Sequence, residues 1–215
     1  MVFCKEAMMK FLWRVLITVS ALIFILTIFL GDARSEEDRI RAKIGIQIKS
    51  GDRMMRAKSR DRLIKDDMLR IYVHPEKSCY VYVVHADDKE PTLLNMVEQK
   101  VQGSTLVMPS LDEYYQVDGN SPKESFTIIV SHEELTDITN LFNDNKVSLS
   151  KWEEMEKRLI QEGKIDLSEK TEKPFPLAGN VRGAGPDDRD PFMRDLQIYS
   201  GKSVLVKRYE FRVKR

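Results

Sequence analysis

The longest mainly apolar run of the chain lies near its N-terminus. Sixteen residues from Val15 to Leu30 carry no charge, and only threonine and serine interrupt the apolar side chains. Three basic residues, Lys5, Lys10 and Arg14, precede the run. A basic stretch followed by an apolar run is typical of a secretory signal or a membrane anchor. Because the basic residues come first, we expect the rest of the chain to cross the membrane.

Residues 1–35 are therefore predicted to be a signal peptide or a membrane anchor. The apolar run is near the upper length for a signal and slightly short of the ~20 residues that a spanning helix prefers. Ala33-Arg34-Ser35 places small residues where a signal peptidase would cut before Glu36. Two outcomes stay open: a tether through residues 15–30 facing the periplasm, or secretion to the periplasm after cleavage near Ser35.

Beyond a charged stem at residues 36–43, short alternations of apolar and polar residues, and a near-continuous apolar run at residues 126–130, predict strands that are bounded by turn residues. The clearest lie at residues 44–48, 69–73, 79–85, 126–130 and 204–214. Weaker ones lie near residues 92–96, 104–108 and 113–117. Short strands at this spacing favour a mainly β fold, an antiparallel β-sandwich or barrel.

Helical patterns appear only after the strand at residues 126–130. Ser131 with Glu134 and Ser150 with Glu153 fit capping boxes, and Gly163 is placed to end the second helix. The pattern predicts one or two short helices, inserted at about residues 131–163 in a β-rich domain over residues 44–215. The apolar face of the second helix is expected to pack on the sheet, and it consists of Trp152, Met155, Leu159 and Ile160.

Several of these stretches carry a family resemblance. They are Met68–Asp87, Thr105–Gly119, Glu124–Phe142 and the closing strand Val206–Lys214. Together they resemble a bacterial domain family of unknown function, the one numbered DUF 4384, over roughly residues 44–215. The family usually has a Gly-Asp pair where Asp66-Asp67 stands here. The resemblance implies a β-sandwich-like domain that is often exported and sometimes carried beside caspase-like peptidase domains. It transfers no catalytic residue.

Composition excludes some function classes. The 215 residues include 35 basic and 34 acidic side chains, a net charge of +1, whereas nucleic-acid binding favours a strongly basic domain. Gly201-Lys202-Ser203 lacks the earlier glycine of a phosphate-binding loop, because Leu196 stands there, so we expect no nucleotide. No other cofactor is predicted. Cys79 is the one cysteine after the apolar run, so the exported part cannot form an internal disulfide.

The candidates for catalysis are a cysteine and two histidines. Cys79 with His74 or His85 would supply a thiol nucleophile and a base, although no third orienting group is evident. His74, His85 and Asp87-Asp88 would converge on a metal if two strands formed a hairpin. We favour the simpler interpretation, in which Cys79 is a small buried side chain and the histidines lie on the surface. No catalytic or metal site is therefore predicted.

Four tyrosines form the only surface candidate: Tyr80, Tyr82, Tyr114 and Tyr115. Exposed together, they would make an aromatic platform for a cell-wall glycan or a peptide. Packing in the sheet, with the hydroxyl groups reaching the rim, is the favoured alternative.

These patterns predict a non-catalytic envelope module, exported or tethered to the membrane, that binds another envelope protein through its loops or an edge strand. Two alternatives stay open. One is a hydrolase or metal-dependent enzyme that uses Cys79, His74 or His85. The other is glycan or peptide binding through the tyrosines.

Overall fold

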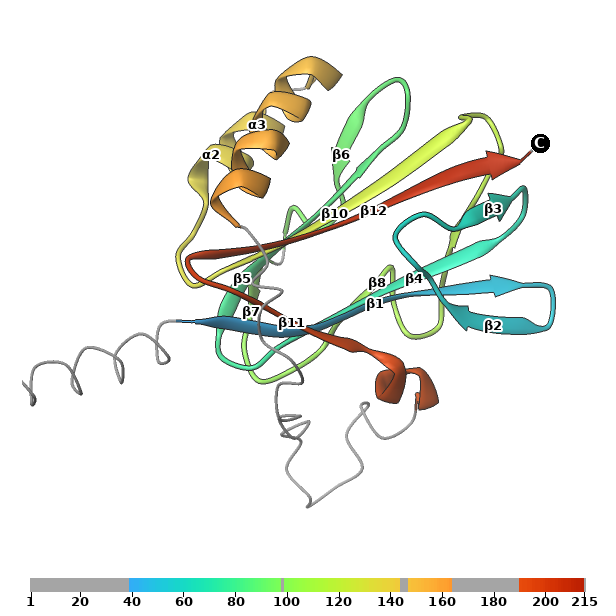
Figure 1. The fold of residues 1–215 in the computed structure, drawn as a ribbon, viewed down its shortest axis with the longest axis horizontal. Helices are drawn as coiled ribbons and strands as arrows, with labels where there is room; N and C mark the ends of the chain where they lie inside the picture. The colour runs from blue at the N-terminus through green and yellow to red at the C-terminus, as the bar shows by residue number, and fades with distance from the viewer. Residues whose placement is uncertain (1–38, 98, 144–146, 164–189, 215) are drawn as a thin grey trace, which may run out of the picture. The chain divides into compact units, whose positions relative to one another are not determined.

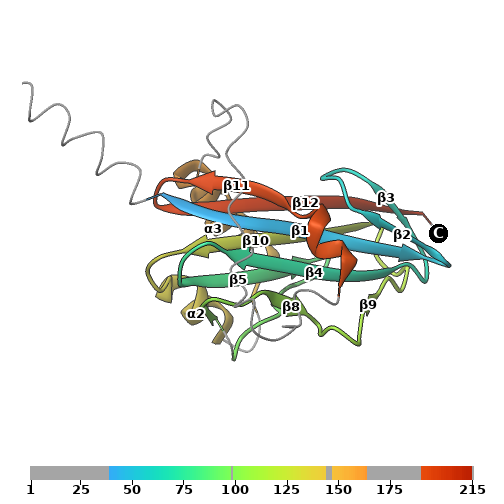
Figure 2. The ribbon, with the colours of Figure 1, turned by 90° about the horizontal axis from the view of Figure 1, so that it is seen from below.

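The computed structural model describes residues 39–97, 99–143, 147–163 and 190–214. The predicted signal or anchor and its cleavage site lie outside these residues. In the described ranges, no helix is long and apolar enough to cross a membrane. The unit from Ile40 to Arg215 is a mainly β domain in which two sheets pack face to face (Figure 1; Figure 2).

The first sheet, sheet A, is built around the long strand β1. Its order is β11 (Gln197–Gly201), β1 (Ile40–Ser50), β4 (Met68–Pro75) and β8 (Leu106–Met108). Two further short strands pair with it, β2 (Arg53–Arg56) with β1 and β9 (Tyr115–Gln116) with β4. Every pairing in this sheet is antiparallel.

The second sheet, sheet B, is built around β12 and β10. Its order is β3 (Arg62–Ile64), β12 (Val204–Lys214), β10 (Lys123–Ser131), β5 (Cys79–Ala86) and β6 (Pro91–Leu93), and β7 (Lys100–Val101) also pairs with β5. The pairing of β3 with β12 is parallel, and the others are antiparallel. The predicted antiparallel β-sandwich is thus confirmed apart from this one short pair.

The core lies between the two sheets, where the predicted alternation places apolar side chains. Ile44 and Ile46 of β1 face Val81, Val83 and other buried residues of sheet B. The first strand begins at Ile40, four residues before the start of the predicted alternation. Pairing with β11 buries Ile40 and the following residues, so the last four residues of the expected stem belong to the sheet.

Helices α2 (Thr136–Asn143) and α3 (Leu149–Glu162) cover part of the outer face of sheet B (Figure 1). With Ser131 as its N-cap the helix would begin at residue 132, but α2 begins at Thr136, four residues later. Ser148, and not Ser150, caps α3 by accepting a hydrogen bond from the backbone N–H of Lys151. Gly163 ends α3 as predicted, and its N–H donates to the carbonyl of Leu159 at 2.8 Å.

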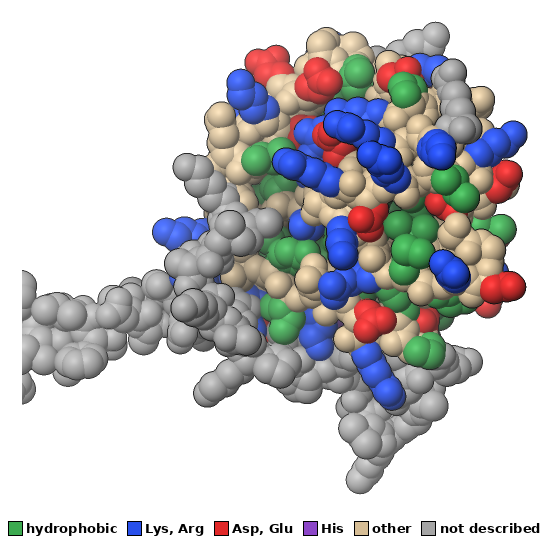
Figure 3. Space-filling view, turned by 45° about the vertical axis from the view of Figure 1, so that its right-hand side comes forward, with side chains coloured by type: hydrophobic (Ala, Val, Ile, Leu, Met, Phe, Trp, Pro, Cys, Tyr) green, Lys and Arg blue, Asp and Glu red, His purple; other side chains and the backbone are tan. Residues whose placement is uncertain are grey.

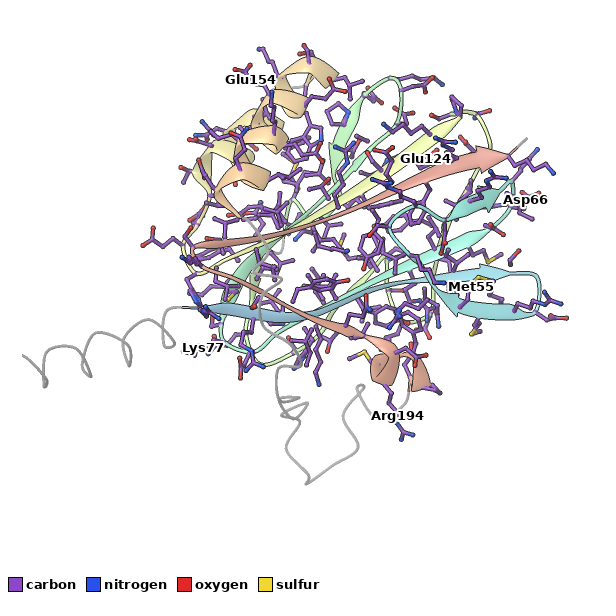
Figure 4. The ribbon with its side chains drawn as sticks, in the orientation of Figure 1. Met55, Asp66, Lys77, Glu124, Glu154 and Arg194 are labelled. Atoms are coloured by element: carbon purple, nitrogen blue, oxygen red, sulfur yellow. The ribbon has the colours of Figure 1, made fainter. Side chains whose placement is uncertain are left out.

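The outer face of sheet A is covered by the 3-10 helix η2 (Pro191–Asp195). Phe192 of η2 packs on the ring of Tyr72, and the Tyr72 hydroxyl donates a hydrogen bond to the carboxylate of Asp190. Burial and this acceptor raise the pKa of Tyr72. In Figure 4, Glu154 of α3 and Arg194 of η2 mark the two opposite outer faces of the sandwich. Sequence patterns had not predicted η2.

The edges of both sheets consist of short strands. The inner strands β1, β4, β5, β10 and β12 contain 8 to 11 residues, whereas the edge strands β2, β3, β6, β7, β8, β9 and β11 contain 2 to 5. Short edge strands are a common way in which β proteins avoid pairing with other chains. This arrangement disfavours the binding of a partner by addition of an edge strand.

Candidate functional site

Cys79 lies beside a histidine that sequence reasoning did not pair with it. Its Sγ is 3.4 Å from Nδ1 of His132, because β5 and β10 run antiparallel and the residue after Ser131 falls opposite Cys79. Burial raises the pKa of the Cys79 thiol to about 11. A thiol with that pKa is almost entirely protonated at neutral pH and is a poor nucleophile.

The structure does not bring Cys79, His74 and His85 together. Cys79 and His85 are six residues apart on β5, a separation of roughly 20 Å along a strand. His74 extends from the outer side of β4 but is buried, and not on the surface as predicted, with its Nδ1 3.0 Å from the hydroxyl of Thr105. Across the described part of the chain, no three His, Cys, Asp or Glu side chains are close enough to hold a metal ion.

The four tyrosines are distributed over three surfaces. Tyr82 is completely buried beneath the helices, and Tyr80 packs beside it on the outer face of sheet B. Tyr114 lies on sheet A with the guanidinium of Arg70 3.8 Å from its ring centre. Tyr115 packs against the core between the sheets. These positions give the four rings no shared exposed surface that could form an aromatic platform.

His85 does have a carboxylate partner in the structure. Its Nε2 is hydrogen-bonded to Glu124, which extends inward from the start of β10, and its ring packs on Phe126 with the ring centres 4.9 Å apart. Both line a cavity of about 190 Å³, here called the histidine pocket, with Asp87, Tyr115 and Asp118 among its other lining residues. Glu124 lies at the end of the sandwich where β12 ends (Figure 4).

The carboxylate of Asp118 in the histidine pocket is part of a turn. The backbone N–H of Asn120 donates to it at 2.7 Å and lowers the pKa of Asp118. The Asp87 carboxylate similarly accepts from the backbone N–H groups of Lys89 and Glu90. These two acids therefore shape loops, and the His85–Glu124 pair is the chemical feature of this cavity.

A second and larger hollow lies on the outer face of sheet B, beyond the helices. It has a volume of about 510 Å³, and its lining residues are Ser59, Arg60, Arg62, Arg208, Glu210 and Arg212. We call it the arginine pocket. Figure 3 views the side of the molecule on which β3 and the end of β12 lie, and lysine and arginine side chains gather there around a few acidic ones.

The strand period places these side chains together. Arg208, Glu210 and Arg212 alternate along β12 with residues of the core, so all three extend outward. The segment before β3 lies along β12, because the N–H of Glu210 donates to the carbonyl of Ser59 at 3.0 Å. Parallel pairing then places Arg62 beside Arg212.

Arg208 is held by two carboxylates. Its Nη1 donates to Glu156 of α3 at 2.8 Å and its Nη2 donates to Glu210 at 3.2 Å, while its buried Nε has no hydrogen-bond partner among the residues that the structure describes. Glu156 is itself buried and also accepts a hydrogen bond from the hydroxyl of Thr127. Glu210 has a second cation, since the Lys123 ammonium is 3.2 Å from its carboxylate.

The other three arginines differ from Arg208. The side chains of Arg60, Arg62 and Arg212 are exposed, and within the described residues their guanidinium groups form no hydrogen bond or ion pair. The pocket thus combines one anchored arginine with three that are available to a ligand. Sequence reasoning predicted the outward alternation of Arg208, Glu210 and Arg212. The approach of residues 59–62, some 150 residues earlier in the chain, left no signal in the pattern.

No protein-family model, curated protein or solved structure matches this chain. The resemblance to the DUF 4384 family therefore stays a prediction from the sequence, and the function has to be inferred from the chain's own residues and geometry.

Proposed function

We propose that this chain is a non-catalytic binding module of the cell envelope that recognises an anionic group of its partner in the arginine pocket. One observation carries the proposal: four guanidinium groups surround a single hollow, and three of them have no partner among the described residues. Guanidinium groups are planar, always charged and weakly hydrated, and their donors match the oxygens of carboxylates and phosphates.

The concentration of positive charge in this pocket is local. The whole chain has a net charge of only +1, so the grouping does not follow from a basic composition. A hollow in which one sign of charge predominates, as four arginines do here over the single acid Glu210, attracts counter-charged groups and speeds their association. A neutral chain with one arginine-rich hollow fits recognition of a small anionic group better than binding along a nucleic acid.

The placement in the envelope is supported by the sequence of the N-terminal segment. A basic stretch followed by sixteen uncharged residues favours export or tethering, with the domain on the far side of the membrane. The partner would then be another component of the envelope. Since the edge strands of both sheets are short, binding through the arginine pocket is better supported than addition of a partner's strand to a sheet edge.

The test compares two triple variants of the full chain that remove the same charge. Arg60→Gln/Arg62→Gln/Arg212→Gln neutralises the pocket, and Arg53→Gln/Lys151→Gln/Lys202→Gln neutralises three exposed residues elsewhere. We expect salt-sensitive retention on an anion-bearing matrix to be lost for the pocket variant and kept by the control. Equal weakening of both variants would show that the binding is only a general charge effect.

A second candidate function is supported by the His85–Glu124 pair. A carboxylate bonded to one ring nitrogen orients an imidazole for work as a general base, and this pair opens on a cavity. A hydrolase at this site requires His85 for its cellular role, whereas the binding module requires the arginines. Loss of the role in His85→Gln at unchanged abundance, together with its retention in the arginine variant, would favour the enzyme.

A further inference from the structure

We infer that the group bound in the arginine pocket is a phosphate that carries two negative charges. This inference rests on the proposed function and specifies its ligand. It starts from a row of three cations that crosses three neighbouring strands of sheet B. Lys123 of β10 is paired with Arg212 of β12, and Arg212 is paired with Arg62 of β3.

Residues paired across neighbouring strands extend from the same face, with their Cβ atoms about 5 Å apart. Like charges in such positions repel each other and destabilise the sheet. Lys123 is compensated by Glu210, but Arg212 and Arg62 have no carboxylate within the described residues. A cation row of this kind is unfavourable in the empty protein and becomes favourable when an anion lies over it.

The charge count favours a dianion. Glu156 and Glu210 are engaged by Arg208 and Lys123, which leaves the three positive charges of Arg60, Arg62 and Arg212 uncompensated. A single carboxylate supplies one negative charge. A phosphate ester with a free terminal phosphate supplies about −1.5 to −2 near neutral pH, together with three strong acceptor oxygens.

The donors around the hollow suit those oxygens. Each guanidinium presents a fork of N–H groups that binds phosphate oxygens in pairs. The hydroxyl oxygen of Ser59 accepts from the ammonium of Lys207 at 3.0 Å, which leaves its proton to donate into the pocket. Arg208 is a positioning residue, since both of its terminal nitrogens are bonded to carboxylates.

Glu210 gives the inference a distinctive signature. Its carboxylate lies on the same face of β12, between Arg208 and Arg212, and bonds to Arg208 and Lys123. A phosphate in the hollow therefore meets repulsion from Glu210. We expect Glu210→Gln to tighten phosphate binding by about two- to fivefold, the size of an exposed charge interaction.

The experiment measures binding to the full chain by calorimetry at pH 7.5 with three probes. Phenyl phosphate is a free phosphomonoester, dihexanoyl phosphatidic acid carries the same group on a soluble lipid, and succinate carries two negative charges on separate carboxylates. We expect both phosphate probes to bind more tightly than succinate. A preference between the two phosphate probes identifies the source of the group, a soluble ester or a lipid headgroup.

Substitutions test whether phenyl phosphate binds in the arginine pocket, and the pH dependence of its affinity tests whether the dianion is the form that binds. Arg212→Gln should weaken phenyl phosphate binding by about tenfold or more, because a charge-assisted hydrogen bond is lost, whereas Arg53→Gln on β2 should have no effect. Affinity should rise between about pH 5 and pH 7, as the ester loses its second proton with a pKa near 6. The arginines do not titrate in that range.

The outcomes separate the two claims. If succinate binds as tightly as phenyl phosphate and Arg212→Gln weakens both, the phosphate inference is wrong and the anion-binding module stands. If no anionic probe binds, both are wrong. If phosphate binds equally to the protein and to Arg212→Gln, the site is not the arginine pocket and the inference is overturned.

Discussion

The outer face of sheet B has two halves that differ in what lies over them. The strand β12 runs through both. Val204 and Val206, near its start, are buried in an apolar cluster beneath the helices, whereas Arg208 and Arg212 extend into the arginine pocket. The backbone is a regular strand throughout, so the side chains alone decide which half is covered.

The covered half contributes to the stability of the domain, and the open half is suited to binding a ligand. In the covered half, Trp152, Leu159 and Ile138 lose contact with water against the sheet, and burial of such side chains is the main stabilising contribution. In the open half, exposed arginines gain nothing from burial and repel their neighbours. Substitutions in the covered half should therefore change stability, and substitutions in the open half should change binding.

The largest expected effect on stability is at Trp152, a fully buried residue of α3 in the covered half. Trp152→Ala removes its contacts with Phe142 and the sheet and leaves a cavity, so we expect a loss of about 3–5 kcal/mol in the free energy of unfolding. Denaturant unfolding measures it. Ile160 is exposed, and not on the packed face of α3 as the sequence pattern predicted, so Ile160→Ala should cost far less. Equal losses would mean that α3 does not cover the sheet.

Cys79, in the core between the two sheets, shows how burial changes the reactivity of a side chain. Since burial raises the pKa of Cys79 from its usual value near 9 to about 11, its thiolate fraction at neutral pH should be about a hundredfold below that of an exposed thiol. Alkylation of Cys79 in the folded domain should be slower at least by that factor, and as fast as a free thiol after unfolding. Rapid alkylation of the native protein would contradict its burial.

The same pKa shift predicts how stability responds to alkali. The raised pKa means that the folded state retains the thiol proton when the unfolded state has lost it. The stabilising contribution is therefore complete below pH 9 and is lost as the pH rises towards 11. Cys79→Ala should flatten the fall in the free energy of unfolding across that interval. An unchanged slope would show that Cys79 does not contribute to it.

Glu156 joins the two halves, because it is buried under α3 and bonds to Arg208 of the pocket. Glu156→Ala leaves the hydroxyl of Thr127 and Nη1 of Arg208 without this acceptor, so we expect a loss of about 1–3 kcal/mol in unfolding free energy. Glu154→Ala is the matched control, since Glu154 is an exposed acid on the same helix (Figure 4). If both variants are equally stable, the buried pair contributes nothing.

Arg212 should show the smallest change in stability. Because Arg212→Gln relieves repulsion in the row with Lys123 and Arg62, we expect the unfolding free energy to stay within about 0.5 kcal/mol or to rise slightly. Thermal unfolding in the absence of anions measures it. A loss of more than 1 kcal/mol would mean that Arg212 has a structural role that the pocket does not explain.

The inner strands were predictable from the sequence, and so were the edge strands β6, β8 and β9, but the other four edge strands were not. The patterns at residues 69–73, 79–85, 126–130 and 204–214 located β4, β5, β10 and β12, because each of these strands has a face in the core. The edge strands β2, β3, β7 and β11 are short, and β2 and β3 lie in a stretch crowded with charge. The pairing of β3 with β12 and of β11 with β1 also depends on partners far along the chain, which no local pattern records.

The site residues show the same division. Outward alternation of Arg208, Glu210 and Arg212 was evident from the sequence, but their meeting with Arg60 and Arg62 depends on the parallel pairing of β3 with β12. Glu156 was also missed, because a glutamate among charged helix residues gives no sign of burial. The pairs Cys79–His132 and His85–Glu124 follow from the register of β5 and β10, which periodicity does not determine.

The most direct test of the arginine pocket is a titration of the isotopically labelled full chain with phenyl phosphate. The backbone amide chemical shifts of the protein are measured at each step. We predict saturable changes at residues 59–62 and 208–212, and none in the histidine pocket at residues 85–87 and 115–118. Changes confined to the histidine pocket, or none at either place, would contradict the account.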